Sequence, residues 1–310
     1  MIVSVVVVTY NSENFIIETL ESIKKQSYKE IELIISDDFS KDNTLKIVEQ
    51  WKNFNEERFK KIIVLESQFN QGIAKNLNKG LKKVQGEWIK IIAGDDILHE
   101  KCVESNVKHI KKDENIKIVF SKAMKFKEVF NENNFCGVLP SKKEQINFTK
   151  SSSEQFSNLL FRGCTFTAAP TMFIKKELLE KIDYFDENYE IEDYPTWLKI
   201  TKEGIKLEFL DEITVYYRIH SNSFSSQNNC CYNEKILKND MKIYEDYKKG
   251  VKGKLSLKIG KQLNYMGQIY TIKKGNKKIK VLSRILFFIS NPIGYIDKIT
   301  EILVLKLGIK

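Results

Sequence analysis

Four short apolar runs, each followed by a polar cluster, recur over the first hundred residues and limit what this chain can fold into. The first run, residues 2–8, is rich in β-branched residues, as expected for a strand buried on both faces of a parallel sheet. Segments with helical spacing of apolar residues separate the runs. Strands are therefore expected at 2–8, 32–36, 61–65 and 87–95, with helices at 13–25, from 42 and from 70. This alternation predicts a parallel sheet with helices on both faces.

The polar clusters all fall where a strand is expected to end. They are Thr9–Ser12, Asp37–Ser40, Asn70–Gly72 and Gly94–Asp96. Ligands of open parallel sheets bind at the carboxyl ends of the strands, and those ends lie along one edge. The sequence therefore predicts one pocket shared by the four clusters.

Two adjacent carboxylates, Asp95 and Asp96, close the fourth apolar run after Gly94. Two like charges at the tip of a buried strand are costly unless a positive group meets them, and a divalent cation carrying an anionic substrate would do so. Gly-Asp is also ordinary turn chemistry. Taken alone, this stretch leaves a metal site and a simple turn equally open.

The pattern changes beyond residue 100. Helices are expected at 103–111, 177–182 and 192–203, and strands at 116–120, 171–174 and 213–219. Residues 131–155 are polar and irregular, which indicates a loop or flap. From about residue 233 onward only helices are expected.

The charge is distributed unevenly along the 310 residues. Residues 248–310 contain 15 Lys and Arg and two acidic residues, whereas the rest of the chain has 36 basic and 39 acidic residues. Charge confined to a tail argues against a nucleic-acid-binding groove. Five cysteines without Cys-x-x-Cys spacing, and an opening run too short and uncharged for an export signal, predict a reduced, cytoplasmic protein.

Several motifs in a fixed order resemble those of the family 2 glycosyltransferases. The resemblance runs from residue 3 to about residue 225 and rests on Val3–Asn11, Asp37–Thr44, Asn70–Asn76, Gly94–Asp96, Glu192–Tyr194 and Tyr217–His220. It implies the GT-A fold of nucleotide-diphospho-sugar transferases, a Rossmann-like, mostly parallel α/β sheet with helices on both faces. The implied domains are a catalytic domain at 1–225 and a basic helical C-terminal extension at 226–310.

The resemblance assigns a donor-binding role to several residues. Tyr10 would stack on the nucleotide base, and Asp38 would accept the uracil N–H, which favours a UDP-sugar. Lys75 would meet the diphosphate. The other implied donor-binding residues are Thr9, Asn11, Gly72, Asn76 and Asp96. The competing interpretations are a turn aromatic for Tyr10, a helix cap near Ser40 for Asp38 and a solvated side chain for Lys75.

The resemblance also implies a metal site for Mn²⁺ or Mg²⁺. Asp95 takes the place of the last acid of the family's Asp-x-Asp motif, and Ala93 stands where the first acid often is. His220 resembles the histidine that completes this site in part of the family; the competing interpretation is a surface histidine. Asp96 would be a second metal ligand or a partner of the donor sugar.

Asp193 resembles the catalytic base of the family. It would take a proton from the acceptor hydroxyl during a single displacement that inverts the anomeric configuration. Glu192 would position Asp193 or bind acceptor hydroxyls. The competing interpretation is a pair of acids that complement a helix N-terminus.

The basic tail carries apolar clusters at 279–289 and 299–307. Basic residues beside apolar helices indicate contact with an anionic membrane surface, and packing on the protein is the alternative. The resemblance implies that the acceptor is a glycan in surface polysaccharide synthesis, and a glycan linked to a polyprenyl diphosphate is expected. A non-catalytic nucleotide-sugar-binding or scaffold protein on the same fold remains the rival hypothesis; nucleic acid is not expected as a partner.

Overall fold

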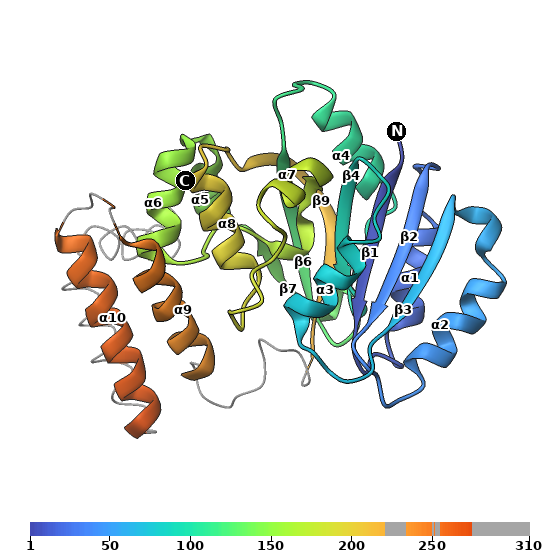
Figure 1. Ribbon diagram of the computed structural model, residues 1–310, viewed down its shortest axis with the longest axis horizontal. Coiled ribbons are helices and arrows are strands. Elements are labelled where there is room, and N and C mark those ends of the chain that lie inside the picture. Colours follow the sequence, from blue (N-terminus) through green and yellow to red (C-terminus); the bar gives the residue numbers. More distant parts are fainter. Residues whose placement is uncertain (221–233, 250, 252–254, 275–310) are drawn as a thin grey trace. The chain divides into compact units, whose positions relative to one another are not determined.

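The computed structural model describes residues 1–220, 234–249, 251 and 255–274 (Figure 1). The chain divides into two compact units. The first comprises Met1–Phe156 and Cys164–Ser223, and the second comprises Ser157–Gly163 and Phe224–Lys310. The domain boundary predicted near residue 225 stays a prediction.

Four parallel strands form one half of the sheet in the first unit, in the order β3-β2-β1-β4. Their bounds are Val3–Thr9 (β1), Ile31–Asp37 (β2), Lys61–Glu66 (β3) and Trp88–Ala93 (β4). Every residue of β2 is buried, which explains why its sequence is a continuous apolar run. The predicted GT-A-like parallel arrangement is confirmed here.

The other half of the sheet continues from β4 as β8-β6-β9-β5, with β7 paired to β6. The strands are Phe173–Lys175 (β8), Ile118–Lys127 (β6), Glu208–Ile219 (β9), Ile97–Leu98 (β5) and Phe135–Leu139 (β7). These pairings are antiparallel except β6 with β9. The sheet is therefore mixed beyond the four parallel strands.

The prediction of a loop or flap over 131–155 is wrong in part. The segment contains β7, the short helix Lys142–Gln145 (α5) and the start of the helix Ser152–Arg162 (α6). Ser141 and Glu144 form a reciprocal capping box that starts α5. The polar residues of this segment thus cap a helix, and β7 forms because the edge of β6 needs a partner for its backbone groups.

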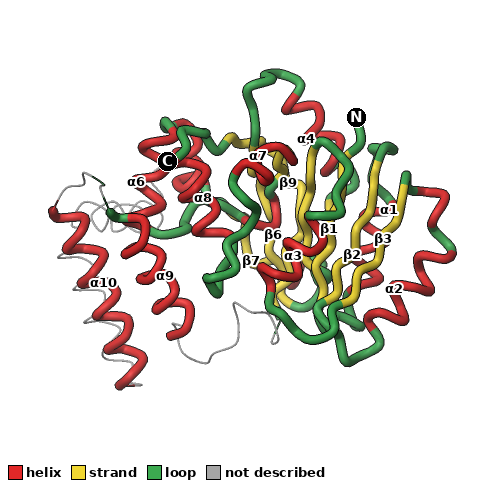
Figure 2. The backbone as a smooth tube through the Cα atoms, viewed as in Figure 1, coloured by secondary structure: helices red, strands yellow, loops and turns green. Residues whose placement is uncertain are grey.

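Helices cover both faces of the sheet, as Figure 2 shows. The helices Ile16–Lys24 (α1), Thr44–Asn53 (α2) and Cys102–Ile110 (α4) share one apolar core with the odd-numbered residues of β1 and β2. The helix Ile73–Leu81 (α3) packs on the opposite face, where Gly80 lies directly over Val6. The helices Lys176–Lys181 (α7) and Asp193–Lys202 (α8) complete the unit.

The second unit contains the helices Glu234–Tyr247 (α9) and Leu255–Lys274 (α10) together with the end of α6. Lys261 of α10 donates to the carboxylate of Asp240 on α9 at 2.6 Å, and Phe161 of α6 packs against Tyr244. Among the described residues, no helix combines the length and apolarity needed to cross a bilayer. The apolar clusters predicted at 279–289 and 299–307 lie outside the described residues.

Candidate active site

The register of the parallel strands brings the predicted polar clusters to one edge of the sheet. Thr9 pairs with Asp37, Asp37 pairs with Glu66, and Val8 pairs with Ala93. The backbone N–H of Asp38 donates to the carbonyl of Thr9, and that of Gly94 donates to the carbonyl of Val8. The residues that follow β1, β2 and β4 are therefore neighbours, although up to 87 positions separate them in the chain, from Thr9 to Asp96.

The Asp38 carboxylate is buried and faces the start of α3. Its two oxygens accept from the backbone N–H groups of Gln71 at 2.9 Å and Gly72 at 2.8 Å. The contact with Ser40 is made instead by Asp37, which accepts from the Ser40 N–H and hydroxyl. The interpretation of Asp38 as a cap near Ser40 is therefore wrong. Because a carboxylate has about four lone-pair sites, Asp38 keeps capacity for a further donor.

The loop after β1 presents Tyr10 to solvent and uses Asn11 to hold the neighbouring loop. The Tyr10 side chain is 46% exposed, so its ring is accessible for stacking. Asn11 has a left-handed backbone, with φ of 49°, and its side-chain oxygen accepts from the N–H of Lys41 at 2.8 Å. Asn11 thereby links the ends of β1 and β2.

Thr9 and Gly94 approach each other closely at the base of this edge. Thr9 is 4% exposed, and its hydroxyl has no hydrogen-bond partner among the described residues. A Cβ atom on Gly94 would lie 2.8 Å from that hydroxyl oxygen. Gly94 is required here because any larger residue would push the Asp95 loop away from β1.

The helix α3 carries three of the predicted donor-binding residues. Gly72 is its N-cap, with φ of 88°, and Lys75 is exposed. Asn76 is buried, and its amide exchanges two hydrogen bonds with Ser36 of β2 at 2.8 Å each. Asn76 therefore anchors α3 on the sheet, and its predicted contact with the donor stays a prediction.

Asp95 and His220 meet although 125 positions separate them in the chain. His220 Nε2 lies 2.9 Å from Asp95 Oδ2, and the two side chains are 10% and 26% exposed. The imidazole also packs on the ring of Phe15 of α1, with 4.8 Å between the ring centroids. The structure thus brings together the two residues that the sequence predicts as metal ligands.

Asp96 is turned inward and is 1% exposed. One carboxylate oxygen accepts from the backbone N–H of Arg218 at 2.9 Å, and the other has no partner among the described residues. Burial, followed by the nearby charge of Asp95, raises the pKa of Asp96 well above its usual value. Its predicted role at the donor sugar stays a prediction.

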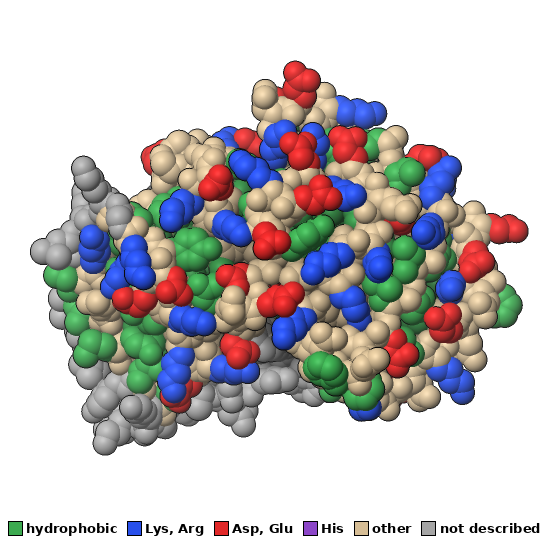
Figure 3. Space-filling view, viewed as in Figure 1, with side chains coloured by type: hydrophobic (Ala, Val, Ile, Leu, Met, Phe, Trp, Pro, Cys, Tyr) green, Lys and Arg blue, Asp and Glu red, His purple; other side chains and the backbone are tan. Residues whose placement is uncertain are grey.

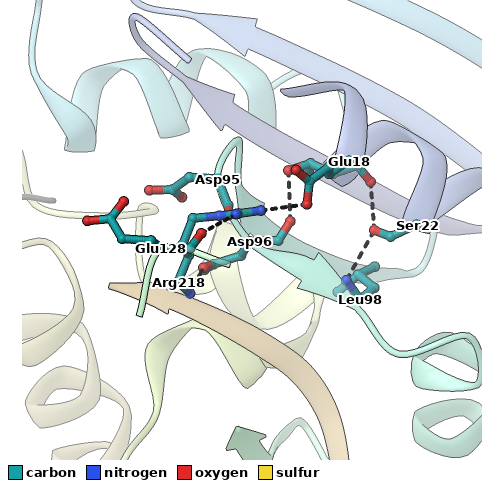
Figure 4. Close-up of polar contacts among 8 residues, drawn as sticks. Glu18, Ser22, Asp95, Asp96, Leu98, Glu128 and Arg218 are labelled. Atoms are coloured by element: carbon teal, nitrogen blue, oxygen red, sulfur yellow. Dashed lines mark hydrogen bonds and ion pairs between the residues drawn. The ribbon is translucent and has the colours of Figure 1, made fainter. Parts of the chain in front are cut away.

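Arg218, in β9, connects the loop of Asp95 and Asp96 to α1 and to the residue after β6 (Figure 4). The guanidinium is buried, donates to the carbonyls of Asp95 and Glu128, and pairs with the Glu18 carboxylate at 2.8 Å. Its Cζ atom lies over two aromatic rings, 4.6 Å from the centroid of Phe15 and 4.1 Å from that of Phe130. The sequence motif Tyr217–His220 contains Arg218 but does not predict this role; the one indication is a cationic residue within a β-rich run.

Lys90 is a second buried cation, and its role was not predicted from the sequence. It is fully buried in β4 and donates to the carbonyls of Pro170 and Met172. Burial lowers its pKa to about 8, although the charges of Cys102 and Asp96 oppose that change. The sequence contained an indication of this: a single lysine in the middle of an apolar strand. A lysine buried there requires hydrogen-bond acceptors that are buried with it.

Asp95 and His220 fit a divalent cation as a partial ligand set. Carboxylate oxygen and imidazole nitrogen both bind Mn²⁺, and Mg²⁺ sites often consist of one or two carboxylates completed by water and phosphate. Within the described residues, no group of three or more His, Cys, Asp or Glu side chains could hold a metal by itself. A cation here would need oxygens from the substrate diphosphate.

Asp193 and Glu192 form the predicted catalytic pair at the start of α8. One oxygen of Asp193 accepts from the N–H of Tyr194 at 2.6 Å, and the other lies 3.9 Å from the thiol of Cys164. Burial, with the added charge of Asp193, raises the pKa of Glu192 to about 7, and burial also raises the pKa of Asp193. Raised pKa values suit groups that accept a proton near neutral pH.

Residues 4–183 match the family model described as glycosyl transferase family 2. The chain belongs to glycosyltransferase family 2. It is 30% identical over 229 residues to the *Escherichia coli* protein named UDP-Glc:alpha-D-GlcNAc-diphosphoundecaprenol beta-1,3-glucosyltransferase WfaP, covering 73% of this chain and 80% of WfaP. It is 27% identical over 289 residues to a glycosyltransferase of *Haemophilus influenzae*, covering 90% of this chain and 83% of that protein.

A solved structure supports the fold independently. The chain aligns with the *S. aureus* TarS 1-349 crystal structure in complex with UDP-GlcNAc, with a TM-score of 0.63 and 22% identity. The alignment covers 94% of this chain and 79% of the TarS chain. The family 2 assignment and the GT-A fold predicted from the sequence are therefore confirmed, and this protein is a glycosyltransferase.

The charge pattern of this glycosyltransferase can be followed on its surface. On the face shown in Figure 3, Lys and Arg side chains are interspersed with Asp and Glu over the parallel strands and their helices. This mixture agrees with the sequence, in which the residues before 248 include 36 basic and 39 acidic residues.

Proposed function

We propose that this glycosyltransferase uses a UDP-sugar and a divalent cation, and that it inverts the configuration of the transferred sugar. The observation that carries the proposal is the contact between Asp95 and His220 at 2.9 Å, beside the strand ends that hold Asp38. A carboxylate and an imidazole that converge from distant segments give a cation two ligands and leave its other positions for a diphosphate.

The donor is assigned to the edge formed by β1, β2 and β4. Asp38 accepts the ring N–H of uracil, the exposed ring of Tyr10 stacks on the base, and Lys75 faces the diphosphate. The printed names of two relatives support uridine: WfaP is named for UDP-Glc, and TarS has been crystallised with UDP-GlcNAc. The sugar itself is glucose, N-acetylglucosamine or a related hexose.

Asp193 takes the proton of the acceptor hydroxyl. The hydroxyl oxygen forms a bond to the anomeric carbon while the bond from that carbon to the diphosphate breaks, and UDP leaves with the electron pair. Because a single displacement attacks the face opposite the leaving group, the product has inverted configuration. Asp95 and His220 would hold Mn²⁺ or Mg²⁺, which would supply positive charge to offset the negative charge that develops on the leaving diphosphate. Glu192, with its pKa near 7, binds acceptor hydroxyls beside Asp193.

The acceptor is a glycan carried on a lipid diphosphate, in surface polysaccharide synthesis. The name of WfaP, which specifies a GlcNAc-diphosphoundecaprenol acceptor, supports this class. A lipid-linked acceptor brings the enzyme to a membrane surface, and the surplus of basic residues in 248–310 suits an anionic surface. Binding of the full chain to anionic vesicles, compared with a chain ending at residue 270, tests this last step.

The central test combines a donor screen with one substitution. Thermal shifts with a panel of nucleotide sugars and Mn²⁺ identify the donor, because a ligand of the folded state raises the melting temperature. Donor turnover is then measured with and without EDTA for the wild type and Asp193→Asn. We expect EDTA to stop turnover and D193N to lower kcat roughly 10²–10⁴-fold.

The matched control for D193N is Asp113→Asn, at an exposed acid that contacts Asn115. It should keep wild-type turnover. A D193N variant as active as the wild type would refute the role of Asp193 as the base. Turnover that continues in EDTA would refute the proposed requirement for a divalent cation.

A further inference from the structure

The segment between α7 and α8 has an unusual backbone. Asp183 and Tyr184 are consecutive, and both have left-handed φ values, 56° and 57°. A side chain with a Cβ atom is strained there, at a cost of about 1–3 kcal/mol per residue, and such strain persists only where neighbours hold the chain in place. This segment leads directly to Glu192 and Asp193.

The end of α7 fixes the first part of the turn. The N–H of Tyr184 donates to the carbonyl of Leu179 at 2.9 Å, and that of Asp183 donates to Glu180 at 3.1 Å. This pair of bonds is the Schellman arrangement that ends many helices. The helix α7 ends at this turn, and the backbone groups of the next residue, Phe185, find their partners in another helix.

Asn78 of α3 holds Phe185 by both backbone groups. Its side-chain NH₂ donates to the carbonyl of Phe185 at 2.8 Å, and its oxygen accepts from the N–H of Phe185 at 3.1 Å. The same NH₂ donates to the Glu187 carboxylate at 2.9 Å. Asn78 is 4% exposed, so these bonds form where water does not compete for them.

The hydrogen bonds of Asn78 to Phe185 connect the helix α3, on the donor side of the site, to the helix α8. Asn76, two positions before Asn78, fixes α3 to β2, and Gly72 at the start of α3 donates to Asp38. On the other side, the ring of Phe185 packs edge-on against Trp197 of α8, with 6.5 Å between the centroids. Trp197 lies one helical turn after Asp193.

We propose that Asn78 is a positioning residue, which sets the place of the Asp193 end of α8 relative to the donor-binding helix α3. This inference rests on the proposed function of Asp193 as the base. Asn78 acts through Phe185 and does not touch the reacting atoms. A base misplaced by about 1 Å can lower turnover roughly 10²-fold, so a single amide suffices for a large effect.

The test is Asn78→Asp, which keeps the size of the side chain. It replaces the NH₂ group by an oxygen that faces the Phe185 carbonyl and the Glu187 carboxylate. The matched control is Asn106→Asp. Asn106 is fully buried in α4, on the opposite face of the sheet, and its NH₂ donates to the carbonyl of Cys102 at 2.8 Å.

Three measurements on the full-length protein separate positioning from general damage. We expect N78D to lower kcat roughly tenfold to 100-fold, measured with the donor that the thermal-shift panel identifies. We expect its affinity for UDP to stay within about twofold of the wild type, because the strand ends are unchanged. Amide hydrogen exchange over residues 182–194 should accelerate in N78D but not in N106D.

A second substitution provides a rescue. In the double variant N78D with Glu187→Gln, the new amide of residue 187 can donate to the new carboxylate, which restores one bond with its polarity reversed. Its kcat should recover part of the loss. If N78D fails to fold, Asn78→Ser, which removes the amide without adding a charge, should show the same split between kcat and UDP affinity.

Several results would overturn the inference. They are equal kcat losses in N78D and N106D, parallel loss of UDP affinity in N78D, or unchanged hydrogen exchange over 182–194. D193N in the same assay distinguishes this failure from failure of the proposed function. An inactive D193N beside a fully active N78D refutes only the role of Asn78, whereas an active D193N refutes the base itself.

Discussion

The two halves of the sheet in the first unit hold their site residues in different ways. In the parallel half, Asp38 and Asn76 are fixed by contacts with Gly72 and Ser36, 34 and 40 positions away. In the mixed half, the Arg218 side chain reaches the Asp95 carbonyl over 123 positions and the Glu18 carboxylate over 200. The parallel half is built from adjacent strand-helix units, whereas the mixed half depends on a few side chains that bridge back to it. Substituting a bridging residue should therefore disturb both stability and ligand binding.

The largest effect is expected for Arg218→Lys. Lysine keeps the charge but cannot reach the Asp95 carbonyl, the Glu128 carbonyl and the Glu18 carboxylate together. We expect about 2–4 kcal/mol of destabilisation in urea unfolding, together with weaker binding of Mn²⁺ and UDP.

The matched control for R218K is Arg58→Lys. Arg58 also donates to several backbone carbonyls, those of Lys24, Gln26, Tyr28 and Lys29, outside the predicted pocket. It should lose stability but keep ligand affinity. Equal losses of affinity in both variants would show that R218K acts through general destabilisation and would break the comparison between the two halves.

A pair of glycine substitutions tests the two ends of the β1 and β4 pair. A Cβ atom on Gly94 would lie 2.8 Å from the Thr9 hydroxyl, and one on Gly86 would lie 2.8 Å from the backbone nitrogen of Ser4. We expect Gly94→Ala and Gly86→Ala each to cost about 1–3 kcal/mol in urea unfolding. Only G94A should also weaken UDP binding in calorimetry, and equal UDP affinity in the two variants would contradict the placement of the donor.

A smaller effect is expected for Asp38→Asn. The amide loses one of the two charge-assisted bonds to the Gln71 and Gly72 N–H groups. We expect UDP to bind roughly tenfold more weakly in calorimetry, equivalent to about 1.4 kcal/mol.

The control for D38N is Glu32→Gln, at the opposite end of the same strand. Glu32 is buried and accepts from the Ser4 hydroxyl and the Gln85 N–H. It should lower stability and leave UDP affinity unchanged. Similar UDP affinities in the two variants would remove Asp38 from the donor site.

The smallest effect on donor binding is expected for Glu192→Gln, which should change the pH dependence of unfolding. The pKa of Glu192 is raised from 4.5 to about 7, so the native state binds more protons than the unfolded state between these values. Stability should therefore fall as pH rises through that window. E192Q should show a flatter profile in urea unfolding from pH 4.5 to 8, and superimposable profiles would contradict the raised pKa.

The parallel half could be predicted from the sequence almost completely. Its strands are buried on both faces, so each reads as an apolar run, and a polar cluster marks each strand end. In the mixed half the prediction was weaker: the segment 131–155, predicted as a loop, contains β7, α5 and the start of α6, and β6 is longer than expected. Edge pairing between β6 and β7 depends on a neighbour that no local pattern reveals.

The sequence by itself determined the family, the parallel strands and the polar clusters at their ends, because each of these follows from local periodicity or from motifs of a few residues. Only the tertiary structure decided that Arg218 fixes the Asp95 loop, that the buried Lys90 donates to the Met172 carbonyl, and that Asn78 binds both backbone groups of Phe185. The physical reason is that these contacts are made by individual side chains to segments far away in the chain, such as Met172, 82 positions from Lys90, and Asp95, 123 positions from Arg218. Such bonds form only after the chain has folded, and they leave no periodic trace in the residues that make them.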